Sequence, residues 1–126
     1  MLGMSGVSPD MRDVERAAAE GGARAKLAID AFVESVRHYI GAYLVALGGC
    51  DVLAFTGGIG ENGIAIREAI CRNLGWAGIE LDKNKNIVRG QEVEISAVES
   101  DARIWIVPTN EELIVARQTA AVLSAN

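Results

Sequence analysis

Two helices are predicted at the start of the chain by the spacing of its apolar residues and by signals at the helix ends. Residues 1–7 are expected to be extended. The Ser8-Pro9 pair then starts the first helix, with serine as the N-cap and proline at the first helical position. Gly21-Gly22 ends that helix. The second helix is predicted over residues 23–47, because its apolar residues form one wide stripe and its charged residues lie off it.

Two apolar runs further along predict strands that are buried on both faces. Residues 51–55 and 104–107 lack polar alternation, which is typical of parallel strands in the interior of a sheet. Residues 92–96 alternate strictly and predict a half-exposed strand. Residues 78–82 predict a short strand or edge segment, and residues 83–90 a polar loop.

Each buried strand is followed by a helical pattern, one ending at Gly75 and one running from Thr109 to about Ser124. The sequence therefore predicts an α/β fold of order β-α-β-α, with a minor strand between and two helices in front. A right-handed crossover is expected. Ligands of such sheets bind at the carboxyl ends of the strands. Those ends are residues 56–62 and 108–111, which we expect to face one cleft.

Composition narrows the class of protein. The 126 residues suffice for a single domain, residues 1–126, and half of them are hydrophobic, which indicates a globular protein. The net charge of −5 and the absence of a basic cluster argue against a nucleic-acid partner. No run approaches a membrane span, and no signal peptide is recognisable. Cys50, Cys71 and His38 lack zinc-site spacing, and a cytoplasmic location is expected.

The glycine-rich stretch Gly57–Gly63 lies between the first buried strand and the helix after it. Such a turn lets backbone N–H groups approach a phosphate. Its spacing, Gly58-x-Gly60-x-x-Gly63, formally matches the dinucleotide fingerprint, and Asp82 stands where the ribose-binding acid is expected. A nucleotide phosphate site, an NAD site and a purely structural turn all remain open. Asn62 is either a helix N-cap or a ligand-orienting amide.

Two further groups are candidates for chemistry. Asp10 suits the first turn of a helix for reasons of dipole, but Arg12 does not and is a candidate nucleotide contact. Thr109-x-x-Glu112 fits a capping box, which gives Glu112 a structural role. Glu111 remains, and it either complements the helix dipole or supports Mg²⁺, which needs only one or two protein carboxylates.

Taken together, six stretches resemble the acetate kinase and propionate kinase family, in that family's order and spacing. They are Ser5-Gly6-Val7-Ser8-Pro9-Asp10-Met11-Arg12, Ala25-Lys26-Leu27-Ala28, Tyr39-Ile40-Gly41-Ala42-Tyr43, Phe55-Thr56-Gly57-Gly58-Ile59-Gly60-Glu61-Asn62, Gly78-Ile79-Glu80-Leu81-Asp82 with Asn86, and Pro108-Thr109-Asn110-Glu111-Glu112-Leu113. The chain resembles only the C-terminal third of such an enzyme. Its combination of motifs is far more specific than any single glycine pattern, and it makes the NAD alternative remote.

The resemblance implies a partial RNase H-like lobe of the superfamily that holds sugar kinases, Hsp70 and actin. It implies ATP-dependent phosphotransfer to acetate or propionate with Mg²⁺, giving an acyl phosphate and ADP. By motif, Asp10, Met11 and Arg12 would contact the adenosine part of ATP or ADP. Glu111 would support Mg²⁺. The nucleotide would be wrapped beside its phosphates by Gly58, Ile59, Gly60, Glu61 and Asn62.

The family's catalytic residues lie in upstream motifs that this chain does not match, and His38 does not replace them. No catalytic residue is therefore assigned, and the chain alone is expected to be inactive. Two roles stay open. One is a kinase fragment, from a split gene or a truncated reading frame, that needs the N-terminal portion. The other is a non-catalytic interaction module with an uncovered sheet edge and apolar helix surface, expected to form a homo-oligomer.

Overall fold

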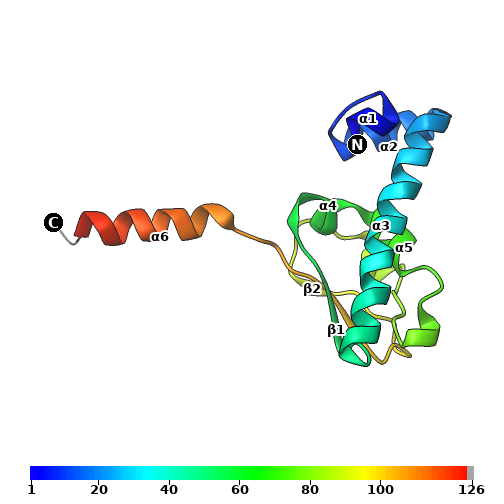
Figure 1. The fold of residues 1–126 in the computed structure, drawn as a ribbon. Helices are drawn as coiled ribbons and strands as arrows, with labels where there is room; N and C mark the ends of the chain where they lie inside the picture. The colour runs from blue at the N-terminus through cyan, green and yellow to red at the C-terminus, as the bar shows by residue number, and fades with distance from the viewer. Residues whose placement is uncertain (125–126) are drawn as a thin grey trace.

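The structure, a computed structural model, describes residues 1–124 apart from the side chain of Glu111. A long helix runs along one side of the body, and the last helix extends away from the sheet (Figure 1). The elements in chain order are α1 (Leu2–Ser5), α2 (Met11–Ala19), α3 (Ala23–Leu47), β1 (Val52–Phe55), α4 (Gly57–Asn62), α5 (Ile64–Cys71), the 3-10 turns η1 (Gly75–Ala77) and η2 (Lys85–Ile87), β2 (Val93–Glu94), β3 (Arg103–Ile106) and α6 (Glu111–Ser124).

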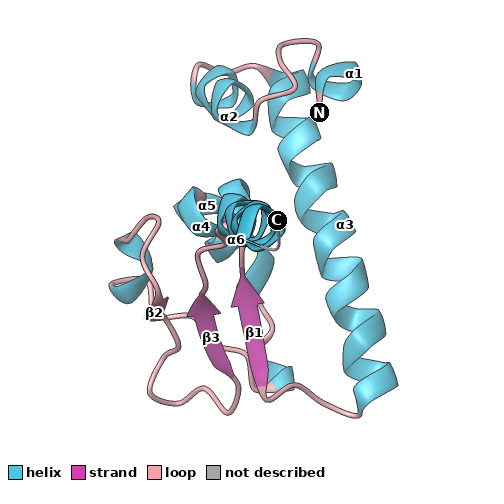
Figure 2. Ribbon diagram, turned by 90° about the vertical axis from the view of Figure 1, so that its left-hand side faces the viewer, coloured by secondary structure: helices cyan, strands magenta, loops and turns pink. Residues whose placement is uncertain are grey.

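The sheet has the strand order β1-β3-β2 (Figure 2). β1 is parallel to β3, with Val52 opposite Arg103, and β2 is antiparallel to β3. The parallel arrangement of the two main strands was predicted correctly. The interior position is confirmed for β3, which lies in the centre of the described sheet with Ile104 and Ile106 fully buried. It is wrong for β1, which is an edge strand whose Val52 is 55% exposed.

The core lies between the sheet, α5 and α3. Ile104 and Ile106 of β3 are fully buried together with Ile79 and Ile95. Ile66 and Ile70 of α5 and Val33 of α3 belong to the same cluster. A smaller cluster (Val14, Ala25 and Ala28) joins α2 to α3. The α3 helix covers residues 23–47 as predicted, because its apolar stripe meets both clusters.

The N-terminal prediction needs two corrections. Residues 2–5 form a helical turn, so the predicted extended entry over residues 1–7 is wrong. The N-cap of α2 is Asp10, whose carboxylate accepts the Arg12 N–H, so the helix begins at Met11. Ser8, the predicted N-cap, lies two residues before Asp10. Its hydroxyl accepts the Asp10 N–H at 3.1 Å and donates to the Asp13 carboxylate at 2.8 Å.

The helix after the glycine-rich stretch, α5, is shorter than predicted. α5 ends at Cys71 instead of Gly75, because Asn73 adopts the left-handed region with φ 59°. Arg37 of α3 closes this end by donating to the carbonyl oxygens of Ile70 at 2.7 Å and Arg72 at 2.6 Å. The predicted strand over residues 78–82 is reduced to one bridge, between Leu81 and Ser96.

The last helix does not begin with the predicted capping box. Asn110 is the capping side chain, since its Oδ1 accepts the Leu113 N–H at 3.0 Å. The Thr109 N–H is donated instead to Glu61, 48 positions away, at 2.9 Å. Residues 112–124 are all exposed, apolar side chains included. An uncovered sheet edge and an uncovered apolar helix surface are therefore both present in the described chain, as expected. None of the described helices combines the length and apolarity that crossing a membrane requires.

Candidate functional site

An open cleft of about 660 Å³ lies between the start of α2 and the glycine helix α4. It joins two motifs that are separated by more than 40 positions in the sequence. Six of the predicted site residues line it. The full lining consists of Asp10, Met11, Arg12, Glu15, Gly58, Ile59, Asn62, Gly63 and Arg89. The cleft therefore combines apolar side chains, guanidinium groups, carboxylates and an amide.

The α2 wall is organised by a tight pair of charges. The Arg12 guanidinium donates to both carboxylate oxygens of Asp10, with Nη2 to Oδ2 at 2.5 Å. The hydrogen bond from the Arg12 side chain, followed by that from the Arg12 backbone N–H, lowers the pKa of Asp10 to about 2. Met11, only 6% exposed, anchors this turn in the core. The charge of Arg12 is thus balanced by Asp10, although the arginine side chain is 87% exposed.

Acidification should weaken the Asp10–Arg12 ion pair in the α2 wall. The pKa of Asp10 falls from 3.8 to about 2 on folding, so the ionised carboxylate stabilises the folded chain. That contribution is complete above the unfolded value and is lost as the pH falls through the folded value. We expect the Asp10 carboxyl resonance, followed by NMR, to titrate near pH 2. In an Arg12→Ala variant the midpoint should rise towards the ordinary value. A wild-type midpoint near 4 would contradict the pair.

The α4 wall is helical, whereas the sequence pattern predicted a turn. Gly57 has φ 70°, a left-handed conformation that favours glycine, and the chain then enters one short helix. Asn62 ends this helix, so it is not an N-cap. Its amide Nδ2 donates to the Gly58 carbonyl oxygen at 3.0 Å. A Cβ on Gly58 would meet nothing within 4 Å, so the surface of this wall is free to receive a ligand.

Two predicted site residues lie behind the cleft instead of lining it. A Cβ on Gly60 would approach the Phe55 backbone to 3.1 Å, and the Gly60 carbonyl accepts from Arg67 at 2.8 Å. Glu61 accepts the N–H and the hydroxyl of Thr109. The Thr109 N–H is the first cause of a lowered pKa for Glu61. These residues join α4 to the segments after β1 and β3. Residues 108–110 do not line the cleft, so the expectation that both strand ends face one cleft stays a prediction. The side chain of Glu111 lies outside the described part of the structure.

Arg67 supports the cleft and was missed from the sequence. Its side chain is fully buried, and burial lowers its pKa. Nε donates to Asn86 Oδ1 at 2.7 Å, Nη1 to the Gly60 carbonyl, and Nη2 to the carbonyls of Asn86 and Val88 at 2.9 and 2.8 Å. One guanidinium thus joins α4 to the 86–88 segment. The sequence contained one indication of this role, because Arg67 lies between Ile66 and Ile70 on the apolar face of a predicted helix.

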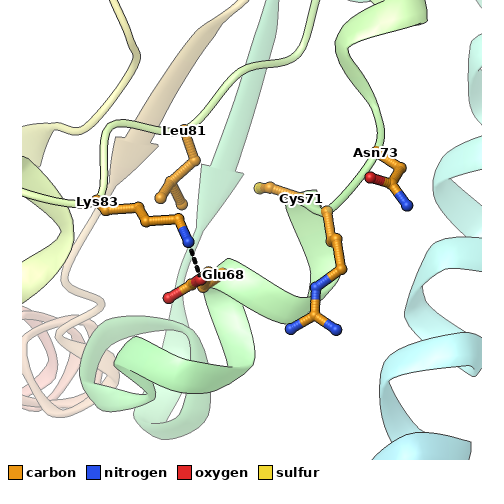
Figure 3. Close-up of a pocket in the computed structure, with 6 residues that line it drawn as sticks. Glu68, Cys71, Asn73, Leu81 and Lys83 are labelled. Carbon is orange, nitrogen blue, oxygen red and sulfur yellow. Dashed lines mark ion pairs between the residues drawn. The ribbon is translucent and has the colours of Figure 1, made fainter.

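Other parts of the described chain do not offer competing chemistry. A pocket of about 210 Å³ is lined in part by Cys71 and by the Glu68–Lys83 ion pair, which is 2.7 Å long (Figure 3). Burial raises the pKa of the Cys71 thiol to about 12, so this thiol stays protonated and is a poor nucleophile. Asp82 accepts the Asn84 N–H at 2.8 Å in a local turn and does not line the cleft.

The fold is that of one portion of an acetate kinase. The crystal structure of Porphyromonas gingivalis acetate kinase superposes with a TM-score of 0.87 and 44% identity, covering 97% of this chain and 31% of that chain. The Entamoeba histolytica acetate kinase gives a TM-score of 0.84 and 30% identity, covering 94% of this chain and 32% of that chain. The predicted partial α/β lobe is thereby confirmed.

The acetokinase family model matches residues 1–117, and the chain belongs to the acetokinase family. It is 54% identical to the acetate kinase of Moorella thermoacetica over 125 residues, which are 99% of this chain and 32% of that enzyme. It is 52% identical to the acetate kinase of Syntrophomonas wolfei over 119 residues, covering 94% of this chain and 30% of that enzyme. The chain therefore spans less than a third of the length of these curated relatives.

Proposed function

We propose that this chain is the nucleotide-binding C-terminal portion of an acetate or propionate kinase, and that it binds ATP or ADP in the α2–α4 cleft. The observation that carries the proposal is the convergence of two distant motifs on one cleft, Asp10–Arg12 from α2 and Gly58–Asn62 from α4. The whole enzyme would transfer the γ-phosphoryl group of ATP to a carboxylate oxygen. We also propose a cytoplasmic location, as expected from the sequence.

Each lining residue has a part in this binding. Met11 and Ile59 offer apolar surface to the base, and the Asp10–Arg12 pair offers a preformed edge of polar groups. The Asn62 amide is exposed and is free to form a hydrogen bond with the nucleotide. The open surface of Gly58 lets the backbone approach the nucleotide closely. Gly60 and Glu61 act from behind, by holding α4 against the strand ends.

Mg²⁺ enters this proposal with the nucleotide. The described residues contain no group of three histidine, cysteine or acidic side chains that would hold a metal ion by themselves. Magnesium bound to a nucleotide keeps several waters and uses one or two carboxylates together with the phosphates. Glu111, at the end of the loop after β3, is the carboxylate that we propose for this support.

We propose no turnover by this chain alone. Phosphoryl transfer requires positioning and neutralisation of charge from several sides, and the cleft supplies one side. His38, an exposed residue of α3, does not line the cleft. The proposed contribution is the binding of the nucleotide, and the acyl acceptor site would lie on the N-terminal portion of the enzyme.

Titration calorimetry of the purified chain with ATP and ADP tests this function. Arg12→Ala and Asn62→Ala should each weaken binding roughly ten-fold, because each removes hydrogen-bonding groups from the cleft. Arg117→Ala, on the exposed α6, is the matched control and should bind as the wild type does. A hydroxamate assay with acetate and ATP should show no acyl phosphate. Absence of nucleotide binding by the wild type would refute the proposal, and hydroxamate formation would refute its inactivity.

A second function, an interaction module derived from the kinase, is favoured by the uncovered surfaces. Strand β1 has one free edge in the described sheet, and its Val52 is more than half exposed, as are Tyr43 and Leu47 of α3. Such surfaces pair with other chains, either the N-terminal portion or a second copy. The Asn62→Ala variant separates the two functions. It should weaken nucleotide binding under the first and leave self-association unchanged under the second.

A further inference from the structure

Arg89 lines the cleft but belongs to none of the motifs that predicted it. Its side chain is exposed and makes no hydrogen bond or ion pair with any described residue. Arg12, the other arginine of the lining, has its charge balanced by Asp10 at 2.5 Å. Arg89 is therefore the guanidinium of the described lining that remains available to a ligand.

The backbone on both sides of Arg89 is fixed to the rest of the site. The carbonyl oxygen of Val88 accepts from the buried Arg67 at 2.8 Å. The N–H of Gly90 donates to the Glu61 carbonyl oxygen at 3.1 Å, and Gly90 adopts φ 58°. A long side chain on a fixed backbone loses less freedom when it binds a ligand than one on a loose loop. Arg89 is thus presented to the cleft by the same network that holds α4.

The charges of the lining indicate which part of a nucleotide this end of the cleft receives. Asp10 and Glu15 balance Arg12 and Arg89, so the described lining carries no net charge. A neutral lining suits the base and ribose of the nucleotide, whose phosphates would extend towards the end of β1. Arg89 lies beside the end of α4, since Asn62 Oδ1 is 3.7 Å from the position of a Cβ on Gly90. The carboxyl end of β1, where phosphates are expected, leads into the start of α4, the end away from Asn62.

We propose that Arg89 stacks the plane of its guanidinium on the base of the bound nucleotide, opposite the apolar surface of Ile59 and Met11. The inference rests on the proposed nucleotide-binding function. A guanidinium is planar and weakly hydrated, so it stacks on aromatic faces in a way that a lysine ammonium does not. Arg89 is then a base-recognition residue, distinct from the motif residues that contact the rest of the nucleotide.

The test is a titration of the whole chain with ATP, ADP, AMP and adenosine. Arg89→Ala and Arg89→Lys should both weaken all four ligands by a similar factor, roughly ten-fold, because stacking is lost in each case. Arg117→Ala is the control for loss of an exposed arginine. Circular dichroism and the unfolding midpoint of each variant should stay close to those of the wild type, since Arg89 is exposed and has no hydrogen bond or ion pair with a described residue.

Two results would overturn the inference while leaving the proposed function intact. One is unchanged binding by both Arg89 variants when Asn62→Ala weakens binding. The other is a loss confined to the phosphorylated ligands and restored in Arg89→Lys, which identifies a phosphate contact. If the wild type binds none of the four ligands, the proposed function fails and the inference fails with it.

Discussion

Arg67→Ala is expected to destabilise the folded chain by about 3 to 5 kcal/mol, because it leaves several buried acceptors without a donor. The arginine is fully buried and donates to Asn86 Oδ1 and to three backbone carbonyl oxygens. Each unsatisfied buried acceptor loses on the order of 1–3 kcal/mol, part of which water recovers when it enters the space. Urea unfolding followed by circular dichroism measures the difference.

Arg67→Lys is the informative partner of this variant. Lysine keeps the charge, but its compact ammonium cannot reach all the acceptors that the planar guanidinium joins. Its loss of stability should lie between those of the wild type and Arg67→Ala. Arg117→Ala, an exposed arginine on α6, should change stability by less than about 0.5 kcal/mol. An Arg67→Ala loss as small as that of the control would show that the network does not support the fold.

The same network links stability to the site. Arg67 holds the carbonyl of Gly60 behind α4 and that of Val88 beside Arg89. The α4 wall and the segment that carries Arg89 therefore both depend on one buried side chain. A positioning residue of this kind should also weaken nucleotide binding in Arg67→Lys, under conditions where that variant is still folded.

The parts of the fold that depend on local pattern were predictable. The apolar stripe of α3 gave residues 23–47 correctly, and the two apolar runs gave the parallel pair β1 and β3. The edge position of β1 was not predictable, because an apolar run does not indicate how many neighbouring strands pair with it. The end of α5 was missed for a local reason, since Asn73 leaves the helical region at a position where the apolar spacing still continues to Leu74.

At the site, motifs found the residues that share a pattern and missed those that act through long-range contacts. Gly58, Gly63 and Asp10–Arg12 meet in one cleft. Arg89 has no motif, and it is placed there because its neighbours Val88 and Gly90 bond to Arg67 and Glu61. The capping box at Thr109 failed for the same reason. Its N–H found a partner 48 positions away, which no local pattern records.

Gly63→Ala is the second change with a large expected effect, a loss of about 1–3 kcal/mol through overpacking. Gly63 joins α4 to α5, and its own conformation, φ −84°, is open to any residue. The obstacle is space, because an added Cβ would lie 2.7 Å from the Ile59 carbonyl oxygen and 3.2 Å from Ile66 Cβ. The third glycine of the dinucleotide-like pattern thus has a steric reason to be there that is independent of any ligand.

Gly41→Ala makes the same chemical change at an open position and is the matched control. A Cβ at Gly41 in α3 would meet nothing within 4 Å, so alanine should stabilise the helix by about 0.5–1 kcal/mol. Unfolding midpoints should therefore move in opposite directions for the two variants. Because Gly63 also lines the cleft, its alanine variant should weaken nucleotide binding even where it is folded. Equal shifts in stability for both variants would show that the α4–α5 junction yields without strain, and that contact with Ile59 does not fix the glycine.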